Sequence, residues 1–253
     1  MKTLSVVIPA LNEEHGIGDV LQEIPIDQLK GMGYSVEVLV IDNGSHDKTP
    51  HIAREKGAKV IIQPIRGYGN AYKAGFANAT GDIIVTGDAD LTYPFGILPD
   101  VIHMIDNDNV DFINTDRLTT LNPAVMEGSH VWGNKLLTIA TRVLFGWPFK
   151  DSQSGMWIFK RSIWKDLQVH SSGMPFSQEL KIEAYLRGFK CIEIPIEYRA
   201  RAGEVKLNTV RDGLGNIKQL IKKRLELGLL LPAPYSETIT KEHTTLDLDE
   251  ILD

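Results

Sequence analysis

Short apolar, β-branched runs alternate along the first half of the chain with longer segments in which apolar and polar residues mix. The runs, each bounded by turn-forming residues, cover 3–9, 36–41, 58–62 and 82–87. The segments between them are of helical length and cover 14–28, 47–57 and 70–79. Strands that alternate with helices in this way form right-handed βαβ units. The pattern therefore predicts an α/β fold with a mostly parallel central sheet that helices flank on both faces.

The alternation continues to residue 116 and then loosens. A helix near 97–108 and a strand near 110–115 complete the first half. The elements predicted beyond it are helices at 131–146, 177–188 and 208–230 and strands at 155–160 and 190–198. Because the sequence shows no internal repeat and no clean linker, we expect one domain over 1–232. Its halves are 1–116 and 117–232, and an acidic polar tail follows at 233–253.

Composition and charge exclude several classes of protein. The chain is 43% hydrophobic and 24% charged, which is typical of a globular protein, and its net charge of −6 argues against wholesale nucleic-acid binding. Cys191 has no partner for an internal disulfide, which suits a reducing compartment. No apolar run approaches the roughly 18 residues of a membrane span, and no signal-peptide pattern opens the sequence. We expect a cytoplasmic protein, or one that touches a membrane without crossing it.

The charge is unevenly distributed along the second half. From Arg199 to Arg224 there are eight basic and two acidic residues, whereas the tail from Glu237 carries six acids and one lysine. A basic block in an acidic protein is a candidate site for an anionic partner. No aromatic residues interleave it, so a nucleic-acid-binding module is disfavoured.

The predicted helix that ends this block is amphipathic. Ile217, Leu220, Ile221 and Leu225 share one face, and lysines lie mostly opposite. Such a helix suits the interface of an anionic membrane, with the helix at 131–146 as a second lipid contact. Packing of the same face against the domain explains the pattern equally well, so both interpretations stay open.

Polar clusters follow the predicted strands, which is where ligands bind in parallel α/β sheets. They are residues 9–13 after the first strand, 42–47 after the second and 88–90 after the fourth. The turn after the first strand lacks G-x-G-x-x-G, and the chain contains no G-x-x-x-x-G-K-[ST]. A dinucleotide pyrophosphate site and a phosphate-loop ATPase are therefore excluded.

Asp88 and Asp90 are the sharpest local feature of the sequence. Two carboxylates this close repel each other unless a cation neutralises them, and their hard oxygens suit Mg²⁺ or Mn²⁺. The alternative is that the two aspartates only stabilise the turn that follows the strand, because aspartate is common at strand ends. The cluster 42–47 also has a structural alternative, a loop that leads into a helix, because Ser45 or Asp47 fits the helix N-cap.

The motifs taken together are more specific than any one of them. Four of them occur in the order and spacing of family 2 glycosyltransferases: Pro9-x-x-Asn12-Glu13, Asp42-x-Gly44-Ser45-x-Asp47-x-Thr49, Gly67-x-Gly69-x-Ala71 and Asp88-x-Asp90. The chain resembles that family over at least residues 3–230. Its second half resembles the dolichyl- or polyprenyl-phosphate sugar synthase branch, because 151–155 matches D-x-x-S-G and 193–207 resembles E-x-P-v-x-y-x-x-R-x-G-x-S-K. The resemblance implies a GT-A fold with a nucleotide-sugar-binding half, 1–116, and an acceptor half, 117–232.

The resemblance also implies a role for each matching position. Residues that would bind the nucleotide-sugar are Pro9, Ala10, Asn12, Glu13, Asp42, Gly69, Asp88, Ala89, Asp90, Arg117, Gln153, Arg201 and Lys206. Asp88 and Asp90 would flank the diphosphate and hold Mg²⁺ or Mn²⁺, with Asp90 the direct ligand. Two positions depart from the branch: Thr92 stands where mannose-phosphate synthases often carry glutamine, and Val205 replaces the usual serine.

The implied activity is inverting, metal-dependent transfer of a hexose from a nucleotide-sugar to dolichyl or polyprenyl phosphate at the cytoplasmic face of a membrane. UDP-glucose or UDP-N-acetylglucosamine is favoured over GDP-mannose, and the resemblance leaves room for a homo-oligomer. Catalysis would involve Asp88, Asp90, Arg117, Asp151 and Glu179. One alternative is a transferase of the same fold that acts on a hydroxyl, with Asp151 or Glu179 as its base. A second is a non-catalytic nucleotide-sugar-binding protein.

Overall fold

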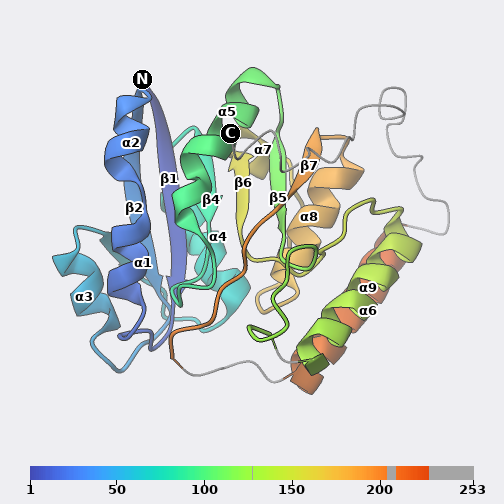
Figure 1. Cartoon of the computed structure of the whole chain (residues 1–253). Helices are drawn as coiled ribbons and strands as arrows, with labels where there is room; N and C mark the ends of the chain where they lie inside the picture. Colours follow the sequence, from blue (N-terminus) through green and yellow to red (C-terminus); the bar gives the residue numbers. More distant parts are fainter. Residues whose placement is uncertain (127, 204–208, 228–253) are drawn as a thin grey trace.

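The computed structural model describes residues 1–126, 128–203 and 209–227, and a seven-stranded sheet runs through them (Figure 1). The strand order is β3-β2-β1-β4-β6-β5-β7. The strands are β1 (Lys2–Ala10), β2 (Tyr34–Asp42), β3 (Lys59–Ile62), β4 (Ile83–Thr86), β5 (Phe112–Asp116), β6 (Trp157–Lys160) and β7 (Cys191–Pro195). The predicted α/β fold with a mostly parallel sheet is confirmed.

Helices cover both faces of the sheet. They are α1 (Ile17–Glu23), α2 (Ile26–Gly31), α3 (Thr49–Glu55), α4 (Tyr68–Asn78), the 3₁₀ turn η1 (Phe95–Ile97), α5 (Leu98–Asn107), α6 (Gly128–Phe145), α7 (Arg161–Trp164), α8 (Phe176–Leu186) and α9 (Thr209–Glu226). Alternate residues of β1 point to opposite sides. Val6 and Ile8 join a core with α1, α2 and α5, whereas Val7 joins a second core with α4 and α8.

The structure differs from the predicted elements in two places that matter. Pro25 divides the predicted helix 14–28 into α1 and α2, because proline breaks the hydrogen-bond ladder of a helix. β6 is antiparallel to both β4 and β5. Its beginning therefore lies at the edge where β4 and β5 end, and residues 151–155 reach that edge.

Helices α6 and α9 lie side by side, away from the sheet (Figure 1). Leu137 and Phe145 of α6 and Leu220 of α9 are buried together with Ile182 of α8, which attaches the pair to the body of the protein. Of the predicted apolar face of α9, Leu220 packs on the domain in this way, whereas Ile217, Ile221 and Leu225 are exposed. Packing on the domain therefore accounts for one of the four positions.

The packing of α4 on the sheet depends on Gly75. A Cβ built there would lie 2.3 Å from Cγ1 of Val7 and 3.2 Å from Cγ1 of Ile41, both of which are fully buried. Glycine at this position therefore allows the helix to approach β1 and β2 closely, despite its low helix propensity.

We predict that Gly75→Ala lowers the free energy of unfolding by about 1–3 kcal/mol, because overpacking outweighs the gain in helix propensity. Urea denaturation measures this change. Gly133→Ala in α6 is the matched control, since a Cβ there meets nothing within 4 Å. The control should be neutral or stabilising by up to about 1 kcal/mol. An equal effect of the two substitutions would contradict the close-packing argument.

Candidate active site

The loops after β1 and β2 are joined at the carboxyl edge of the sheet. The backbone N–H of Asn12 donates to the Ser45 hydroxyl (2.9 Å), and the N–H of His46 donates to Oδ1 of Asn12 (2.8 Å). Asp42, only 4% exposed, accepts the N–H of Ser45 (3.0 Å). Asn12 has a φ of +52°, a conformation that asparagine tolerates better than most residues. The first two predicted clusters therefore form one structured rim.

The N-terminal end of α4 closes the same end of the site; it consists of the N-cap Gly67 and the first helical residues to Gly69, and is called the Gly67–Gly69 turn below. The N–H of Gly67 donates to Oδ1 of Asn43 (2.8 Å), which follows Asp42. Gly67 has a φ of +143°, and a Cβ there would lie 2.3 Å from the carbonyl oxygen of Ser172. A Cβ at Gly69 would lie 2.5 Å from that of Ser171. Both glycines are thus required by the close approach of residues 171–172.

Asp88 and Asp90 lie beyond the end of β4. Asp90 is 2% exposed; its Oδ1 accepts the Thr92 hydroxyl (2.6 Å), and its Oδ2 pairs with Nη2 of Arg201 (2.7 Å). Burial raises the pKa of Asp88 to about 7, and the nearby Asp90 carboxylate adds to the rise. Arg201 and Arg117 oppose it. Thr92, a departure from the branch's pattern, therefore acts here by orienting Asp90.

The donor set of this pair fits a divalent cation. Within residues 1–126, 128–203 and 209–227, no group of three or more His, Cys, Asp or Glu side chains could hold a metal ion. Asp88 and Asp90 offer two carboxylates at this position. Mg²⁺ is typically held by one or two carboxylates together with substrate phosphates and water. A cation there would also relieve the repulsion that raises the pKa of Asp88.

Arg117 and Asp151 form a buried bidentate ion pair. Nε of Arg117 lies 2.7 Å from Oδ2 of Asp151, and Nη2 lies 3.0 Å from Oδ1. Asp151 is fully buried; burial alone would raise its pKa, but the Arg117 guanidinium outweighs burial and lowers the pKa. A general base near neutral pH needs a pKa near 7. Asp151 is therefore held as a permanent anion that orients Arg117.

Lys181 of α8 is buried under the loop that carries Asp151. Its Nζ donates to the carbonyl of Ser154 (2.8 Å) and lies 5.7 Å from the centre of the Trp157 ring. Burial lowers the pKa of Lys181 to about 7, although the Asp151 carboxylate opposes the shift. Lys181 is not among the residues predicted from the sequence, because a lysine in a helix of mixed polar and apolar residues is usually exposed to solvent. The sequence indicates the burial of Lys181 only by its position beside the apolar series Phe176, Leu180 and Ala184.

Five of the predicted residues come together at the edge of the sheet. The charges that shift the pKa of Asp88 are those of Asp90, Arg201, Arg117 and Glu13. Arg201 also lies 3.7 Å from Glu13, and Gln153 donates through its amide to Gln178. Ala10 and Ala89 are buried in the core below. Lys206 and Val205 lie outside the residues that the structure describes.

Glu179 is not part of this group. Its Oε2 accepts the backbone N–H groups of His170 (3.2 Å) and Ser171 (2.8 Å), and its Oε1 lies 3.7 Å from Nζ of Lys223 on α9. The side chain is 3% exposed. These contacts direct Glu179 to a neighbouring loop and to α9.

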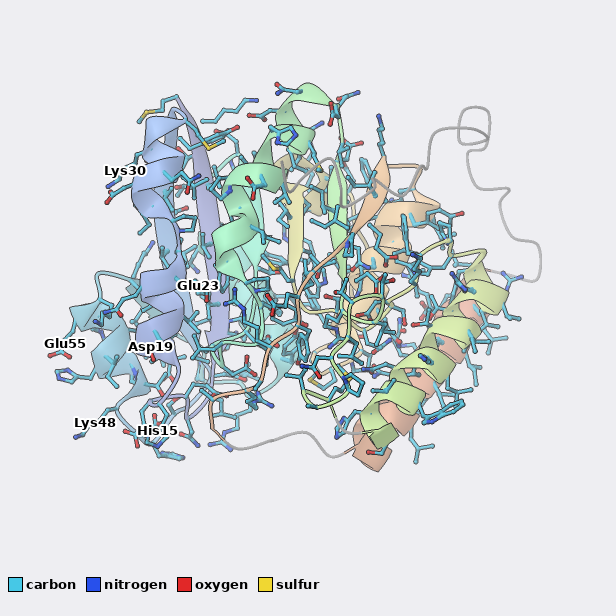
Figure 2. The ribbon with its side chains drawn as sticks, viewed as in Figure 1. His15, Asp19, Glu23, Lys30, Lys48 and Glu55 are labelled. Carbon is cyan, nitrogen blue, oxygen red and sulfur yellow. The ribbon has the colours of Figure 1, made fainter. Side chains whose placement is uncertain are left out.

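The segment after β7 crosses back over the sheet to the β1 side and completes the site (Figure 1). The N–H of Arg199 donates to the carbonyl of Thr92 (3.1 Å), and that of Ala202 donates to the carbonyl of Asp90 (2.9 Å). Arg199 also pairs with Glu23 of α1 (2.6 Å), which is labelled in Figure 2. Backbone bonds and an ion pair thus bring Arg201 to Asp90.

Comparison with known proteins identifies relatives over most of the chain. The model of glycosyl transferase family 2 matches residues 5–168. A dolichyl-phosphate hexose transferase of Haloferax volcanii is 37% identical over 90% of this chain and 96% of its own length. The low-salt glycan biosynthesis hexosyltransferase Agl6 of the same organism is 38% identical over 87% of this chain, which spans about half (53%) of that protein.

Solved structures share the fold. Glucosyl-3-phosphoglycerate synthase from Mycobacterium tuberculosis, crystallised with Mn²⁺, UDP and glucosyl-3-phosphoglycerate, superposes with a TM-score of 0.71. The match covers 88% of this chain and 80% of that one at 23% identity. At this identity the likeness establishes the architecture alone.

We predict that Asp88 gives the metal-free protein a measurable pH dependence of stability. The pKa of Asp88 is about 7 in the folded protein and has its ordinary value of 3.8 in the unfolded chain, so the unfolded chain releases this proton at lower pH. The free energy of unfolding should therefore fall between about pH 4 and 7, relative to Asp88→Asn, and level off above pH 7. Denaturation in EDTA across this range measures the difference. The exposed control Asp100→Asn should keep the wild-type profile, and parallel profiles for wild type and Asp88→Asn would refute the assignment.

Proposed function

The chain belongs to glycosyl transferase family 2, and from this premise we propose that it transfers a hexose from a nucleotide-sugar to dolichyl or polyprenyl phosphate. The observation that carries the proposal is the meeting of two carboxylates with two guanidinium groups: Arg201 forms an ion pair with the buried Asp90, and the charges of Arg201 and Arg117 both act on the half-buried Asp88. The carboxylates suit a metal-bound diphosphate, and the guanidinium groups suit phosphate oxygens. The names of the Haloferax relatives support the same assignment.

In the proposed reaction the rim around Asp42 holds the base and ribose, and Asp88 and Asp90 face the diphosphate. A divalent ion held there supplies positive charge for the nucleoside diphosphate that leaves. Arg201 keeps one donor unused, because its buried Nε has no hydrogen-bond partner among the described residues. A phosphate oxygen would satisfy that donor. We propose UDP-glucose or UDP-N-acetylglucosamine as the donor, with GDP-mannose as the alternative.

The acceptor chemistry explains why no protein base is required. A phosphate monoester has a second pKa of about 6 and is mostly ionised at pH 7, so its oxygen is already a nucleophile. It attacks the anomeric carbon, the bond from that carbon to the donor's phosphate oxygen breaks, and the configuration inverts. A hydroxyl acceptor would need a base, but Asp151 is paired with Arg117 and Glu179 faces another loop. These contacts favour the phosphate acceptor.

We predict that one radiolabelled donor from a panel of UDP- and GDP-sugars enters organic-extractable lipid in the presence of short dolichyl phosphate. EDTA should abolish transfer and Mg²⁺ or Mn²⁺ should restore it. Asp90→Asn should lower the rate at least about 100-fold, as removal of one charge-stabilising group at an active site does. The exposed Asp100→Asn should transfer at the wild-type rate.

Two outcomes would redirect the assignment. Nucleotide-sugar binding without lipid product from any donor would exclude the phosphate acceptor and favour a hydroxyl. Binding with neither transfer nor hydrolysis would support the non-catalytic alternative.

We further propose that the paired helices α6 and α9 rest on an anionic membrane surface, where a polyprenyl phosphate lies. Eight of the twelve exposed large hydrophobic side chains found among the described residues lie on these two helices. On α6 they are Trp132, Leu136, Ile139 and Val143, and on α9 they are Leu214, Ile217, Ile221 and Leu225. Their spacings of three and four place each set on one stripe.

The charge beside these stripes favours an anionic surface as the occupant. Lys135 and Arg142 of α6 and Lys218 and Lys222 of α9 are exposed. Lysines and arginines that flank an apolar face attract anionic lipid. Among the helices of the described residues, none is long and apolar enough to cross a bilayer. Contact along the two stripes is the mode of attachment that this surface allows.

We predict that the protein co-sediments with vesicles containing anionic lipid more than with neutral ones, and less at high salt. Leu136→Glu with Ile221→Glu should reduce binding at least about tenfold, because two charges replace inserted apolar groups. Met32→Glu, an exposed hydrophobic position on α2's C-terminal side, is the control. Unchanged vesicle binding, or loss of a stable dimer in solution with the same double variant, would assign the face to another role or to a second copy of the chain.

A further inference from the structure

Residues 170–172 lie against the Gly67–Gly69 turn at the donor end of the site. The carbonyl of Ser172 accepts the N–H of Asn70 (3.1 Å), and the carbonyl of His170 accepts Nζ of Lys73 (2.9 Å). The two glycines leave no room between the turn and this segment. The position of residues 170–172 therefore sets the position of the Gly67–Gly69 turn. The turn is also bonded to Asn43, the residue that follows Asp42, through the N–H of Gly67.

Glu179 holds that segment from the other side. One of its oxygens accepts two consecutive backbone N–H groups, those of His170 and Ser171. The carboxylate is almost fully buried, so these bonds form in a medium of low dielectric constant and are strong. Removing the acceptor would leave two partly buried N–H groups without this partner, which favours a shift of the segment.

Lys223 of α9 supplies the charge that this buried carboxylate needs. Its Nζ lies 3.7 Å from Oε1 of Glu179, contacts Oε1 of Glu183 and donates to the carbonyl of Gln168 (3.0 Å). The Lys223 side chain is 4% exposed and Glu183 is 5% exposed. Burial raises the pKa of Glu183, but its bonds, with that to Lys223 the strongest, outweigh burial and lower it. Lys223 is thus shared by two acids of α8, of which Glu183 is also paired with Arg187 (2.7 Å), and it holds Gln168 just before the segment.

We propose that Glu179 and Lys223 are positioning residues for the nucleotide-sugar, acting through residues 170–172 on the Gly67–Gly69 turn; this inference rests on the proposed function. The chain of contacts runs from α9 to α8, to the segment, to the turn and to the end of β2. Neither residue touches the reacting atoms. Their effect is therefore on donor binding, whereas a base at Glu179 would act on the rate of the chemical step.

Glu179 variants separate the two roles. Glutamine keeps a carbonyl oxygen that accepts both N–H groups, whereas alanine does not. We expect Glu179→Ala to raise the donor KM about tenfold, as loss of hydrogen bonds to a charged acceptor does, with kcat within about threefold. Glu179→Gln should restore most of the donor affinity and keep kcat. A general base would instead lose about 100-fold or more in kcat with glutamine, at unchanged KM.

Lys223→Met tests the far end of the chain of contacts. It should raise the donor KM in the same direction as Glu179→Ala, whereas Lys30→Met should not. Lys30 is the matched control because it forms a surface ion pair with Asp27 on α2, a helix at the other end of the sheet (Figure 2). Calorimetry with the free nucleoside diphosphate and Mg²⁺ gives the same comparison without transfer.

Amide hydrogen exchange tests the proposal without a measurement of catalysis, and it also shows whether the variant is folded. In Glu179→Ala, exchange should rise at His170, Ser171 and Asn70, while amides of β1 keep their protection. Unchanged exchange at Asn70 would overturn the positioning role, whatever the nucleotide. Failure of the wild type to label lipid would refute the proposed acceptor and leave this readout intact.

Discussion

The ion pair between Arg117 and Asp151 holds together the part of the molecule on which the site depends. Arg117 follows β5 and Asp151 precedes β6, so the pair spans two antiparallel strands at the edge where ligands bind. Removing one partner of a buried pair typically costs about 3–5 kcal/mol, because the other charge stays buried. Glu193 of β7 also accepts the N–H of Asp151 (3.1 Å). The contacts of Asp151 therefore connect the ends of β5, β6 and β7.

The same constraint governs the donor end of the site, where acids are in excess. Asp88, Asp90 and Glu13 lie close together there, and Arg201, from the segment after β7, forms ion pairs with Asp90 and Glu13. An arginine from the second half of the chain thus joins acids that come from the first half. The clustered carboxylates favour the binding of a further cation, which matches the chemistry of a metal-bound diphosphate.

Much of the fold and of the site could be predicted from the sequence. The strands β1 to β4 were predicted because their apolar runs are bounded by turn residues, and the family was identified from motifs that the comparisons confirm. The direction of β6 could not be predicted, since four residues carry no signal for it. The burial of Lys181 and Glu179 was also missed. It follows from α8 being covered on all sides, with residues 176–184 buried in succession, which is a property of the tertiary structure.

The position of β6 between β4 and β5 determines when the sheet can form during synthesis of the chain. β5 pairs with β6 and β7 and has no pairing with β4 in the described sheet. On a ribosome, the first 116 residues therefore emerge with β4 exposing an unpaired edge and β5 without a neighbour. An open edge is a template for aggregation until another strand covers it. Residues 157–160 close that edge, so a nascent chain gains a continuous sheet only after β6, which follows β5 by a long connection, has been synthesised.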